Sequence, residues 1–569
     1  MNITTPIESD EYVRYHRTIM PEAMDQAEAA LVRVKAPIYQ NKGRLVQLIR
    51  LDAAVSDDGV RRKRGALQVQ ELNHHRLLEI FIKHVKFATW DARKNKFVRN
   101  APPLEFAKHY SARGQWKLRV LNGIVEAPTL RPDGTVIAKP GYDDATGIYF
   151  APGGVKFPPV PDKPTRKQAR EALSLLKDVL KDFPFVPDDE DKPLGAPSAS
   201  RSVALSAILT AICRKALRTA PAHAFSATTM GTGKSLLCDT VAMIATGREA
   251  TATSHGKTEE ELNKRLFSML LKGDPVVVID NIEDPVRSDE FCTVLTAETW
   301  QSRILGLSKT GVVPTNVLFL LNGNGLSFEG DIRTRVIMWG QDARMEDPGE
   351  RTFDRDLRKY VPAERARLAV AALTVLRAFV VAGRSGLDEF PPFGRFEDWS
   401  DLVRGALIWL GEPDPCATRE AIDAIDPERD KLSALLRAWE AAIGPEKWLT
   451  ASEIIAATQW TEDFEDEGPN PVMTRLDHAD DLETAIKEAL SSNFPVARNL
   501  GKYLNRYSGR IVDGRSVQVH ATRGHSAKYA LKIEAMAGDN SPAPYPEVAR
   551  ARRGTTADRP EIEDDGSDW

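Results

Sequence analysis

Most of the chain carries apolar residues at a helical or an alternating spacing, and these two patterns predict its secondary structure. Apolar residues that recur every three or four positions predict helices over residues 21–34, 73–90, 164–183, 201–217, 364–383 and 399–411. Alternating or continuous apolar runs predict strands over residues 44–51, 65–72, 275–280 and 316–324. Residues 118–150 read as strand, turn and strand, and residues 447–534 as three helices followed by alternating strands.

The succession of these patterns predicts an α/β protein of several domains. A chain of 569 residues is too long for one hydrophobic core. We expect an α+β domain at 1–160, a helical connector and linker at 161–219, an α/β core at 220–345, a helical lid at 346–445, a helix-and-strand domain at 446–534 and a disordered tail at 535–569. The tail is assigned by its composition, because it lacks a periodic apolar face.

Composition identifies no partner but argues against some classes of protein. The chain is 42% hydrophobic and 28% charged, with a net charge of -4, and basic residues can still gather on one face of such a protein. Its four cysteines form no C-x-x-C pair, which argues against a zinc site and a disulfide framework and for reduced thiols. Residues 1–20 have acids and no apolar core, and no apolar run reaches about 18 residues. We therefore expect a cytoplasmic protein without a membrane segment.

The segment FSATTMGTGKSLLCDTVAMIATG, residues 225–247, is typical of a phosphate-binding loop that leads into a helix. The usual spacing is G-x-x-x-x-G-K-[ST]. Here Gly233, Lys234 and Ser235 fill its end, and Thr228 stands in place of the first glycine. Such a loop needs backbone N–H groups around the phosphates, a lysine to neutralise their charge and a hydroxyl for Mg²⁺. The residues predicted to hold ATP are Thr229, Met230, Gly231, Thr232, Gly233, Lys234, Ser235 and Leu236.

A second motif, VVVIDNIED, occupies residues 276–284. A buried strand that ends in an acid places a carboxylate at the carboxyl edge of a parallel sheet, next to the phosphate-binding loop. Asp280 is then the acid that holds Mg²⁺ together with Ser235. Asn281 takes the place in which a water-polarising Glu is usual, and Glu283 and Asp284 follow. The sequence does not show which of these residues is the catalytic base.

Between and after the two core strands lie further candidate residues. SRILGL and GVVPTN read as the strands of a β-hairpin joined by the turn SKTG, with Lys309 at its tip. After the second core strand come Asn324, Arg333 and Arg335.

The order GTGKS, VVVIDN, hairpin lysine, LLNGN and GDIRTRV resembles a AAA+ ATPase. More narrowly, it resembles the superfamily 3-type helicase modules of phages, phage satellites, plasmids and integrated elements, which are often fused to primases. Residues 126–150 resemble the segment that precedes the ATPase in such proteins, and residues 500–533 resemble their winged-helix tail. The resemblance covers about residues 100–535. It implies a AAA+ P-loop ATPase core with a helical lid and a winged-helix-like domain.

The same resemblance implies an ATP-dependent DNA helicase that works as a ring, as a hexamer, with ATP and Mg²⁺ between subunits. In it, Asn324 positions the attacking water, and Arg333 or Arg335 reaches the γ-phosphate of the neighbouring subunit, where a cation stabilises transition-state charge. Lys309 would hold a phosphate of single-stranded or forked DNA in the channel, since a lysine on a moving loop can grip and release phosphates. No primase pattern is found, so priming is left to a separate protein.

The C-terminal residues indicate nucleic-acid binding independently of the ATPase motifs. Arg498, Lys502 and Arg506 are spaced four apart and share one face of a predicted helix. The stretch RSVQVHATRGHSAKYALKI then reads as a hairpin with Arg523, His525 and Lys528 around its turn. A basic helix followed by a basic hairpin suits DNA.

Two other functions are compatible with the same residues. The protein could bind ATP and DNA and only load or recruit another replication protein. It could also be a weakly hydrolysing nucleotide sensor with a role in assembly or defence. Lys309 favours the helicase, whereas Asn281 favours the other two functions.

Overall fold

In the computed structural model, the chain forms two compact units, residues 1–426 and residues 427–569. The described residues are 12–57, 59–189, 191–193, 196–227, 230–256, 258–303, 310–345, 347–351, 353–419, 422, 427–463, 472–520 and 526–533. The tail expected at 535–569 lies outside them. Within the described part of the chain, no helix is both long enough and apolar enough to cross a bilayer.

The first unit begins with three helices that pack on a small sheet. The helices are α1 (Met20–Arg33), α2 (His74–His84) and α3 (Leu104–Ala112). The sheet has the order β1-β7-β8, from Val13–Tyr15, Phe87–Asp91 and Lys96–Arg99. Helix α2 therefore ends earlier than the predicted 73–90, because Phe87 and Ala88 are buried in a strand that pairs with β1 and β8. Aromatic residues favour such pleated, half-buried surfaces.

A group of short strands connects this layer to the rest of the unit. One sheet has the order β2-β3-β6, from Tyr39–Asn41, Arg44–Arg50 and Leu67–Glu71. A second has the order β12-β13-β9, from Gly141–Asp143, Ile148–Phe150 and Gly123–Val125. The predicted turn at Asp133 and Gly134 joins the two-stranded pair β10 (Thr129–Leu130) and β11 (Val136–Ile137).

The central sheet of the first unit has seven strands among the described residues, in the order β20-β14-β19-β16-β15-β5-β4. Five of them run parallel: β14 (Ala222–Ala227), β15 (Thr251–Ser254), β16 (Val276–Ile282), β19 (Leu318–Asn324) and β20 (Val336–Gln341). The other two, β4 (Val55–Asp57) and β5 (Val60–Arg62), come from the N-terminal region, and β5 pairs antiparallel with β15. The N-terminal region thus contributes two strands to this sheet.

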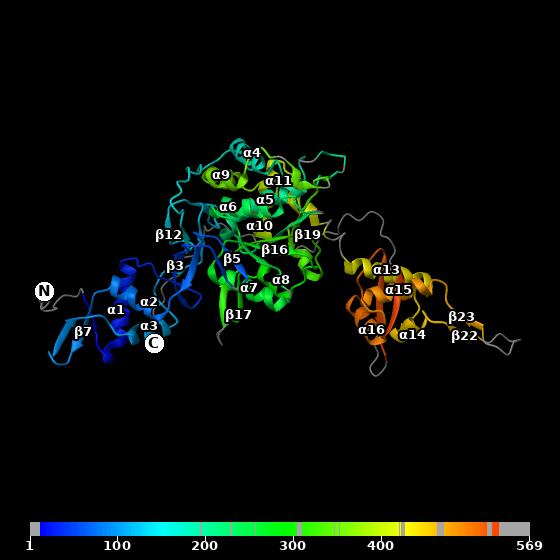
Figure 1. Ribbon diagram of the computed structural model, residues 1–569, viewed down its shortest axis with the longest axis horizontal. Coiled ribbons are helices and arrows are strands. Elements are labelled where there is room, and N and C mark those ends of the chain that lie inside the picture. The colour runs from blue at the N-terminus through cyan, green and yellow to red at the C-terminus, as the bar shows by residue number, and fades with distance from the viewer. Residues whose placement is uncertain are drawn as a thin grey trace, which may run out of the picture. The chain divides into compact units, whose positions relative to one another are not determined.

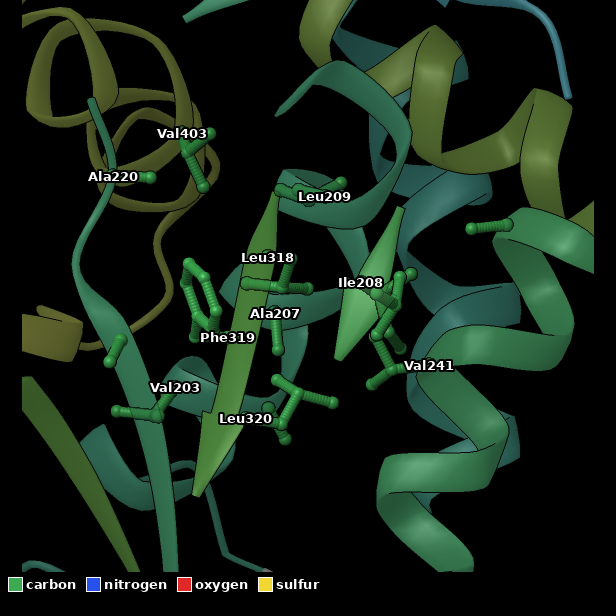
Figure 2. Packing of buried hydrophobic residues seen from close by; sticks show 14 of the residues in the cluster. Val203, Ala207, Ile208, Leu209, Ala220, Val241, Leu318, Phe319, Leu320 and Val403 are labelled. Atoms are coloured by element: carbon green, nitrogen blue, oxygen red, sulfur yellow. The ribbon is translucent and has the colours of Figure 1, made fainter. Parts of the chain in front are cut away.

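Helices cover both faces of the central sheet (Figure 1). Helices α5 (Ala199–Cys213) and α6 (Lys234–Thr246) lie on one side, with α4 (Arg166–Leu180) and α9 (Leu357–Val381) outside them. Helices α7 (Glu259–Lys272) and α8 (Asp289–Thr296) lie on the other side. Helix α5 is buried almost all round, since Val203, Ala207 and Ile208 pack against Leu318 and Leu320 of β19 (Figure 2). A helix that is apolar all round belongs in a core.

Smaller elements complete the first unit. They are the hairpin strands β17 (Thr299–Arg303) and β18 (Thr310–Pro314), the helical run α10 (Glu397–Trp399), η6 (Ser400–Arg404, a π-helical segment) and α11 (Gly405–Leu410), and the 3₁₀ turns η1 (Arg17–Ile19), η2 (Arg214–Ala216), η3 (Gly330–Arg335), η4 (Pro348–Glu350), η5 (Leu387–Glu389) and η7 (Pro415–Thr418). The four cysteines of the chain form no disulfide bond with one another.

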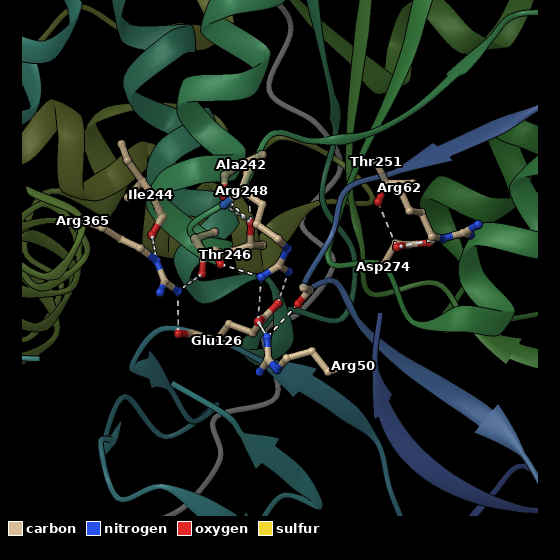
Figure 3. Close-up of polar contacts among 12 residues, drawn as sticks. Arg50, Arg62, Glu126, Ala242, Ile244, Thr246, Arg248, Thr251, Asp274 and Arg365 are labelled. Carbon is tan, nitrogen blue, oxygen red and sulfur yellow. Dashed lines mark hydrogen bonds and ion pairs between the residues drawn. The ribbon is translucent and has the colours of Figure 1, made fainter. Parts of the chain in front are cut away.

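A buried carboxylate joins distant segments at the C-terminal end of α6 (Figure 3). Glu126 is 5% exposed and accepts hydrogen bonds from Arg50 (3.1 Å) and from Arg248 (2.9 Å). Arg365 of α9 donates to the backbone carbonyls of Glu126 (2.6 Å) and of Ala245 in α6 (2.9 Å). Burial lowers the pKa of Arg365 to about 10, and the nearby Glu126 opposes that shift.

The second unit has its own core of helices against a three-stranded sheet. Its helices are α13 (Pro427–Ala442), α14 (Ala451–Ala456), α15 (Ala479–Leu490) and α16 (Ala497–Arg506). The sheet order is β21-β25-β24, from Leu449–Thr450, Lys528–Ile533 and Arg515–His520, and a separate hairpin joins β22 (Thr461–Asp463) to β23 (Val472–Thr474). Leu436, Trp439 and Leu482 lie in this core, so α13 is part of the second unit.

Replacing Glu126 with Gln should lower the free energy of unfolding by about 2 to 3 kcal/mol. Removing one partner of a fully buried ion pair costs about 3–5 kcal/mol, and the Arg248 side chain keeps 17% exposure, which moderates that cost. Urea unfolding of the full chain gives the difference. The matched control is Glu79→Gln in the surface pair with Arg76, which should cost less than about 0.5 kcal/mol. Equal losses for the two variants would contradict a special role for Glu126.

Candidate functional site

The glycine-rich loop lies between β14 and α6, where the sequence places it. Strand β14 ends at Ala227, and α6 begins at Lys234 directly after Gly233. Gly231 and Gly233 have φ values of 78° and 100°, a backbone region that favours glycine. A Cβ at Gly231 would also come within 3.2 Å of the backbone nitrogen of Gly349. Both glycines are therefore required by the shape of the loop, while Thr228 and Thr229 lie outside the described residues.

Lys234 reaches from the start of α6 to the end of β19. Its Nζ donates a hydrogen bond to Oδ1 of Asn324 at 2.7 Å and lies 3.4 Å from Oγ1 of Thr232. Burial lowers the pKa of the lysine, and the nearby Cys238 and Asp280 oppose that shift. Two residues that the sequence analysis assigned to the site, Lys234 and Asn324, are thus in direct contact.

Asn322 connects two further predicted residues, although the sequence analysis did not single it out. Its side-chain Nδ2 donates to Oγ of Ser235 at 2.9 Å and to Oδ1 of Asp280 at 2.6 Å. The register explains this arrangement, because β16 and β19 are parallel neighbours and their carboxyl ends meet at one edge of the sheet. Asn322 and Asn324 are two residues apart in β19, a spacing that puts them on one face and that could have signalled both.

Asn281 stands at a bulge that ends β16. The pairing of β16 with β19 shifts register between Ile279 and Ile282, and Asn281 has a φ of 55°. Asn tolerates this left-handed region better than most residues. Its backbone N–H donates to Oδ1 of Asp280 (3.1 Å), and its side-chain Nδ2 donates to Oε1 of Glu283 (2.8 Å). The Asn at this position therefore fits the backbone and holds the exposed carboxylate of Glu283 in one orientation.

Two pockets meet at the glycine-rich loop. The first has a volume of about 350 Å³ and is lined by the loop, Asp280, Asn281, Asn322 and Asn324. The second, of about 360 Å³, lies beside Gly233 and is lined by Phe183, Leu236 and Phe353, together with the arginines Arg351, Arg355 and Arg358. Arg351 donates to the carbonyl of Thr232 at 2.8 Å, and burial lowers its pKa. The predicted site residue Met230 is 78% exposed at the mouth of the first pocket.

Asp280 and Ser235 fit a Mg²⁺ ion that arrives with a nucleotide. Among the described residues, no group of three His, Cys, Asp or Glu side chains is arranged to hold a metal. Magnesium on a nucleotide needs no such cage, because it takes one or two carboxylates together with phosphate oxygens and waters. Asn322 brings the Ser235 hydroxyl and the Asp280 carboxylate into one cluster, which is the donor set that such an ion uses.

The two candidate arginines differ in their surroundings. Arg335 is 5% exposed and donates to the backbone carbonyl of Asp331 (2.6 Å) and to its carboxylate (3.0 Å). Arg333, in the same 3₁₀ turn η3, is only partly buried. Arg335 therefore stabilises η3 within its own chain, and Arg333 is the more exposed of the two.

The predicted DNA-contacting residues lie partly outside the described part of the chain. The hairpin strands β17 and β18 pair antiparallel, from Thr299 opposite Pro314 to Arg303 opposite Thr310. Their connection with Lys309 lies outside the described residues, as do Arg523 and His525.

In the second unit, Arg498, Lys502 and Arg506 of α16 and Lys528 of β25 are all exposed. The opposite face of α16 is buried, and a hydrogen bond from the hydroxyl of Tyr529 to the carbonyl of Gly501 (3.2 Å) fixes α16 on β25.

Comparisons with known proteins give weak structural likenesses. No family model matches the chain, and no curated protein matches it in sequence. An apo structure of the NrS-1 C-terminal region is 13% identical and covers 89% of this chain and 98% of its own, with a TM-score of 0.36. A structure of SCCmec type IV Cch, described as an active helicase, is 12% identical and covers 87% and 97%, with a TM-score of 0.33. A JCV helicase structure is 12% identical and covers 42% and 67%, with a TM-score of 0.17.

The left-handed backbone at Asn281 predicts which substitutions the bulge accepts. Asn281→Gly should change the free energy of unfolding by less than about 0.5 kcal/mol, because glycine adopts this region without strain. Asn281→Val should lower it by about 1 to 2 kcal/mol, because a β-branched residue is strained in this left-handed region, which Asn tolerates. Urea unfolding of both variants measures the contrast, and a valine variant as stable as the glycine variant would contradict the bulge geometry.

Proposed function

We propose that this protein is an ATP-dependent DNA helicase of a mobile genetic element, which translocates on DNA as a hexameric ring. The observation that carries the proposal is the joint placement of Lys234 on Asn324 and of Asn322 on both Ser235 and Asp280. A lysine, a hydroxyl, a carboxylate and an amide at one sheet edge are the groups that hold and hydrolyse a nucleoside triphosphate.

ATP binding uses the loop and its two pockets. The backbone N–H groups of residues 231–235 and the positive end of α6 hold the phosphates, and Lys234 neutralises their charge. Asp280 and Ser235 would hold Mg²⁺, which supplies further charge neutralisation on the phosphate oxygens. The nucleoside end enters the second pocket, where Phe183, Leu236 and Phe353 offer apolar surface and Arg351 secures the loop wall.

Hydrolysis needs a base for the attacking water, and we assign that role to Glu283. Its carboxylate is oriented by the Asn281 amide at 2.8 Å, on the strand end that also carries Asp280. The water oxygen bonds to the γ-phosphorus, its proton passes to Glu283, and the bond to the β,γ-bridging oxygen breaks to leave ADP and phosphate. Asn324 orients the water, since its side chain lies at the same edge beside Lys234.

The proposal also assigns a ring contact and DNA contacts to cations outside the pocket. We assign Arg333 as the cation that reaches the γ-phosphate of the adjacent subunit, because Arg335 is buried in its own turn whereas Arg333 is only partly buried. Lys309 on the β17–β18 hairpin would hold a DNA phosphate in the channel. Arg498, Lys502, Arg506, Arg523 and Lys528 would bind DNA from the winged-helix-like domain.

A loader or recruitment factor that binds ATP and DNA without unwinding is the second candidate. Asn281 favours it, because the position directly after Asp280 usually carries a catalytic Glu. In this chain the first carboxylate after Asp280 is that of Glu283.

Two variants test the ATPase part of the proposal. Lys234→Ala should reduce ATP turnover by at least about 100-fold, because it removes a cation from the phosphates. Glu283→Gln should reduce turnover by about 100-fold or more while nucleotide affinity stays near wild type, because the base acts only in the chemical step. Asp284→Asn is the matched control and should retain most activity. Normal turnover in Lys234→Ala would mean that this loop is not the active site.

Strand displacement on forked DNA, with and without ATP, then separates the helicase from the loader. The helicase proposal expects wild-type protein to displace the strand only with ATP, and Lys234→Ala to displace none. ATP hydrolysis and DNA binding without any displacement would overturn the helicase proposal in favour of the loader.

The exposed face of α16 gives a separate prediction for DNA binding. Replacing Arg498, Lys502 and Arg506 together with Ala should make the slope of log affinity against log salt concentration less steep by about 2 to 3. Each lost phosphate contact reduces the magnitude of that slope by about 0.7–0.9. Fluorescence anisotropy with labelled DNA between low and physiological salt measures this slope. Lys487→Ala, which removes a cation paired with Glu483 on α15, is the control and should leave the slope unchanged. An unchanged slope in the triple variant would remove α16 from the DNA interface.

A further inference from the structure

The basic stretch RRKRG at residues 61–65 belongs to a hairpin that is fixed to the central sheet. Strand β5 pairs antiparallel with β15, with Arg61 opposite Ala252 and Val60 opposite Thr253. Arg62 is buried and holds the buried carboxylate of Asp274, with Nη2 2.7 Å from Oδ2 (Figure 3). Thr251 of β15 also donates to that carboxylate, at 2.9 Å. The strand pairing and the buried ion pair therefore fix the position of the hairpin beside the candidate site.

Alternation along β5 sends Arg61 to the opposite face from Arg62. Arg61 lies opposite Ala252, and Ala252 lies opposite Val278, so their side chains share the face that also carries Asp280. Because Ala250 and Ala252 are small, this face leaves a pocket of about 470 Å³ between the hairpin and α6. The pocket is lined by Arg61 at one side and by Ser235 and Asp280 at the other.

Arg61 reaches across this pocket to the metal-side acid. Its Nη2 lies 3.5 Å from Oδ2 of Asp280. The other carboxylate oxygen, Oδ1, already accepts hydrogen bonds from Asn322 and from the backbone of Asn281. Oδ2 is therefore the oxygen that a divalent cation would share with Ser235, and the guanidinium stands on that side.

We infer that Arg61 is a positioning residue that competes with Mg²⁺ for Oδ2 of Asp280 and so sets the Mg²⁺ requirement of nucleotide binding. This inference rests on the proposed ATPase function. Arg61 and Mg²⁺ would use the same carboxylate oxygen, so binding of the ion requires the guanidinium to give that oxygen up. The side chain of Arg61 is 64% exposed, so it can turn aside while Arg62 keeps the hairpin in place.

The exposure of Arg61 also limits the size of the effect. Exposed ion pairs are weak because water and salt screen them. Their removal changes a competing equilibrium by about two- to five-fold. An effect of this size is measurable as a shift in the Mg²⁺ concentration at half-saturation.

The test is a Mg²⁺ titration of nucleotide binding by the full chain, read from a fluorescent non-hydrolysable ATP analogue. Arg61→Ala should lower the half-saturating Mg²⁺ concentration by about two- to five-fold, because the competing cation is gone. Arg61→Lys keeps the charge and should stay within about two-fold of wild type. Arg64→Ala is the matched control, since Arg64 is exposed in the same basic stretch and has no ion pair among the described residues; it should not shift the titration.

If wild-type protein binds the analogue normally and Arg61→Ala has an unchanged or higher half-saturating Mg²⁺ concentration, the inference about Arg61 is wrong. That result would leave the proposed ATPase function standing. Absence of Mg²⁺-dependent analogue binding in wild-type protein would overturn the proposed ATPase, and the inference with it. A shift of equal size in Arg64→Ala would show a general charge effect and would also overturn the role of Arg61.

Discussion

The buried carboxylate of Glu126 is the constraint on which the position of α6 depends. A carboxylate in the interior has to be paired, and Glu126 is paired by Arg50 from the N-terminal strands and by Arg248 just after α6. Arg365 adds a cation at the last carbonyls of α6, where the helix dipole favours positive charge. One end of α6 is therefore fixed by charge. Because the helix is a rigid rod of 13 residues, its other end, with the glycine-rich loop, is fixed as well.

At that other end, the site is organised by the carboxyl edge of the sheet. Parallel pairing of β16 and β19 brings Asp280 beside Asn322, and the alternation of β19 adds Asn324 on the same face. The amide of Asn322 then bonds both Ser235 and Asp280 and so holds the two side chains together. The N-terminal hairpin β4–β5 extends this same sheet and carries Arg61 to the remaining oxygen of Asp280. The N-terminal region is thus part of the wall of the proposed nucleotide site as well as a module of its own.

The sequence predicted the parts of this arrangement that depend on local patterns. Periodicity located α1, α4, α5, β16 and β19. Motif spacing singled out Lys234 and Ser235, a buried strand that ends in an acid singled out Asp280, and the family resemblance singled out Asn324. The sequence did not reveal Asn322, Arg61 or Arg351, because each acts through a partner far along the chain. Pairing of β5 with β15 joins segments nearly 200 residues apart, as the bond from Thr253 to the carbonyl of Gly59 shows, and no local pattern encodes that register. The boundary expected near residue 446 also depended on a local pattern, the end of an all-helical stretch, whereas α13 packs by long-range contacts into the second unit.

The contrast between the two units shows why the net charge of the chain says little about its partners. In the first unit, cations such as Arg62 and Arg248 form ion pairs with buried acids. These pairs stabilise the fold and add almost nothing to the electrostatic potential at the surface. On α16, Arg498, Lys502 and Arg506 are exposed, and within the described residues no carboxylate forms an ion pair with them. Gly501 allows that helix to lie close to Tyr529, where a Cβ would come within 3.1 Å of the hydroxyl, and this contact turns the basic side outward. A chain with a net charge of -4 can therefore present a local positive surface. Its ion pairs neutralise the cations of one region and leave those of another exposed to solvent.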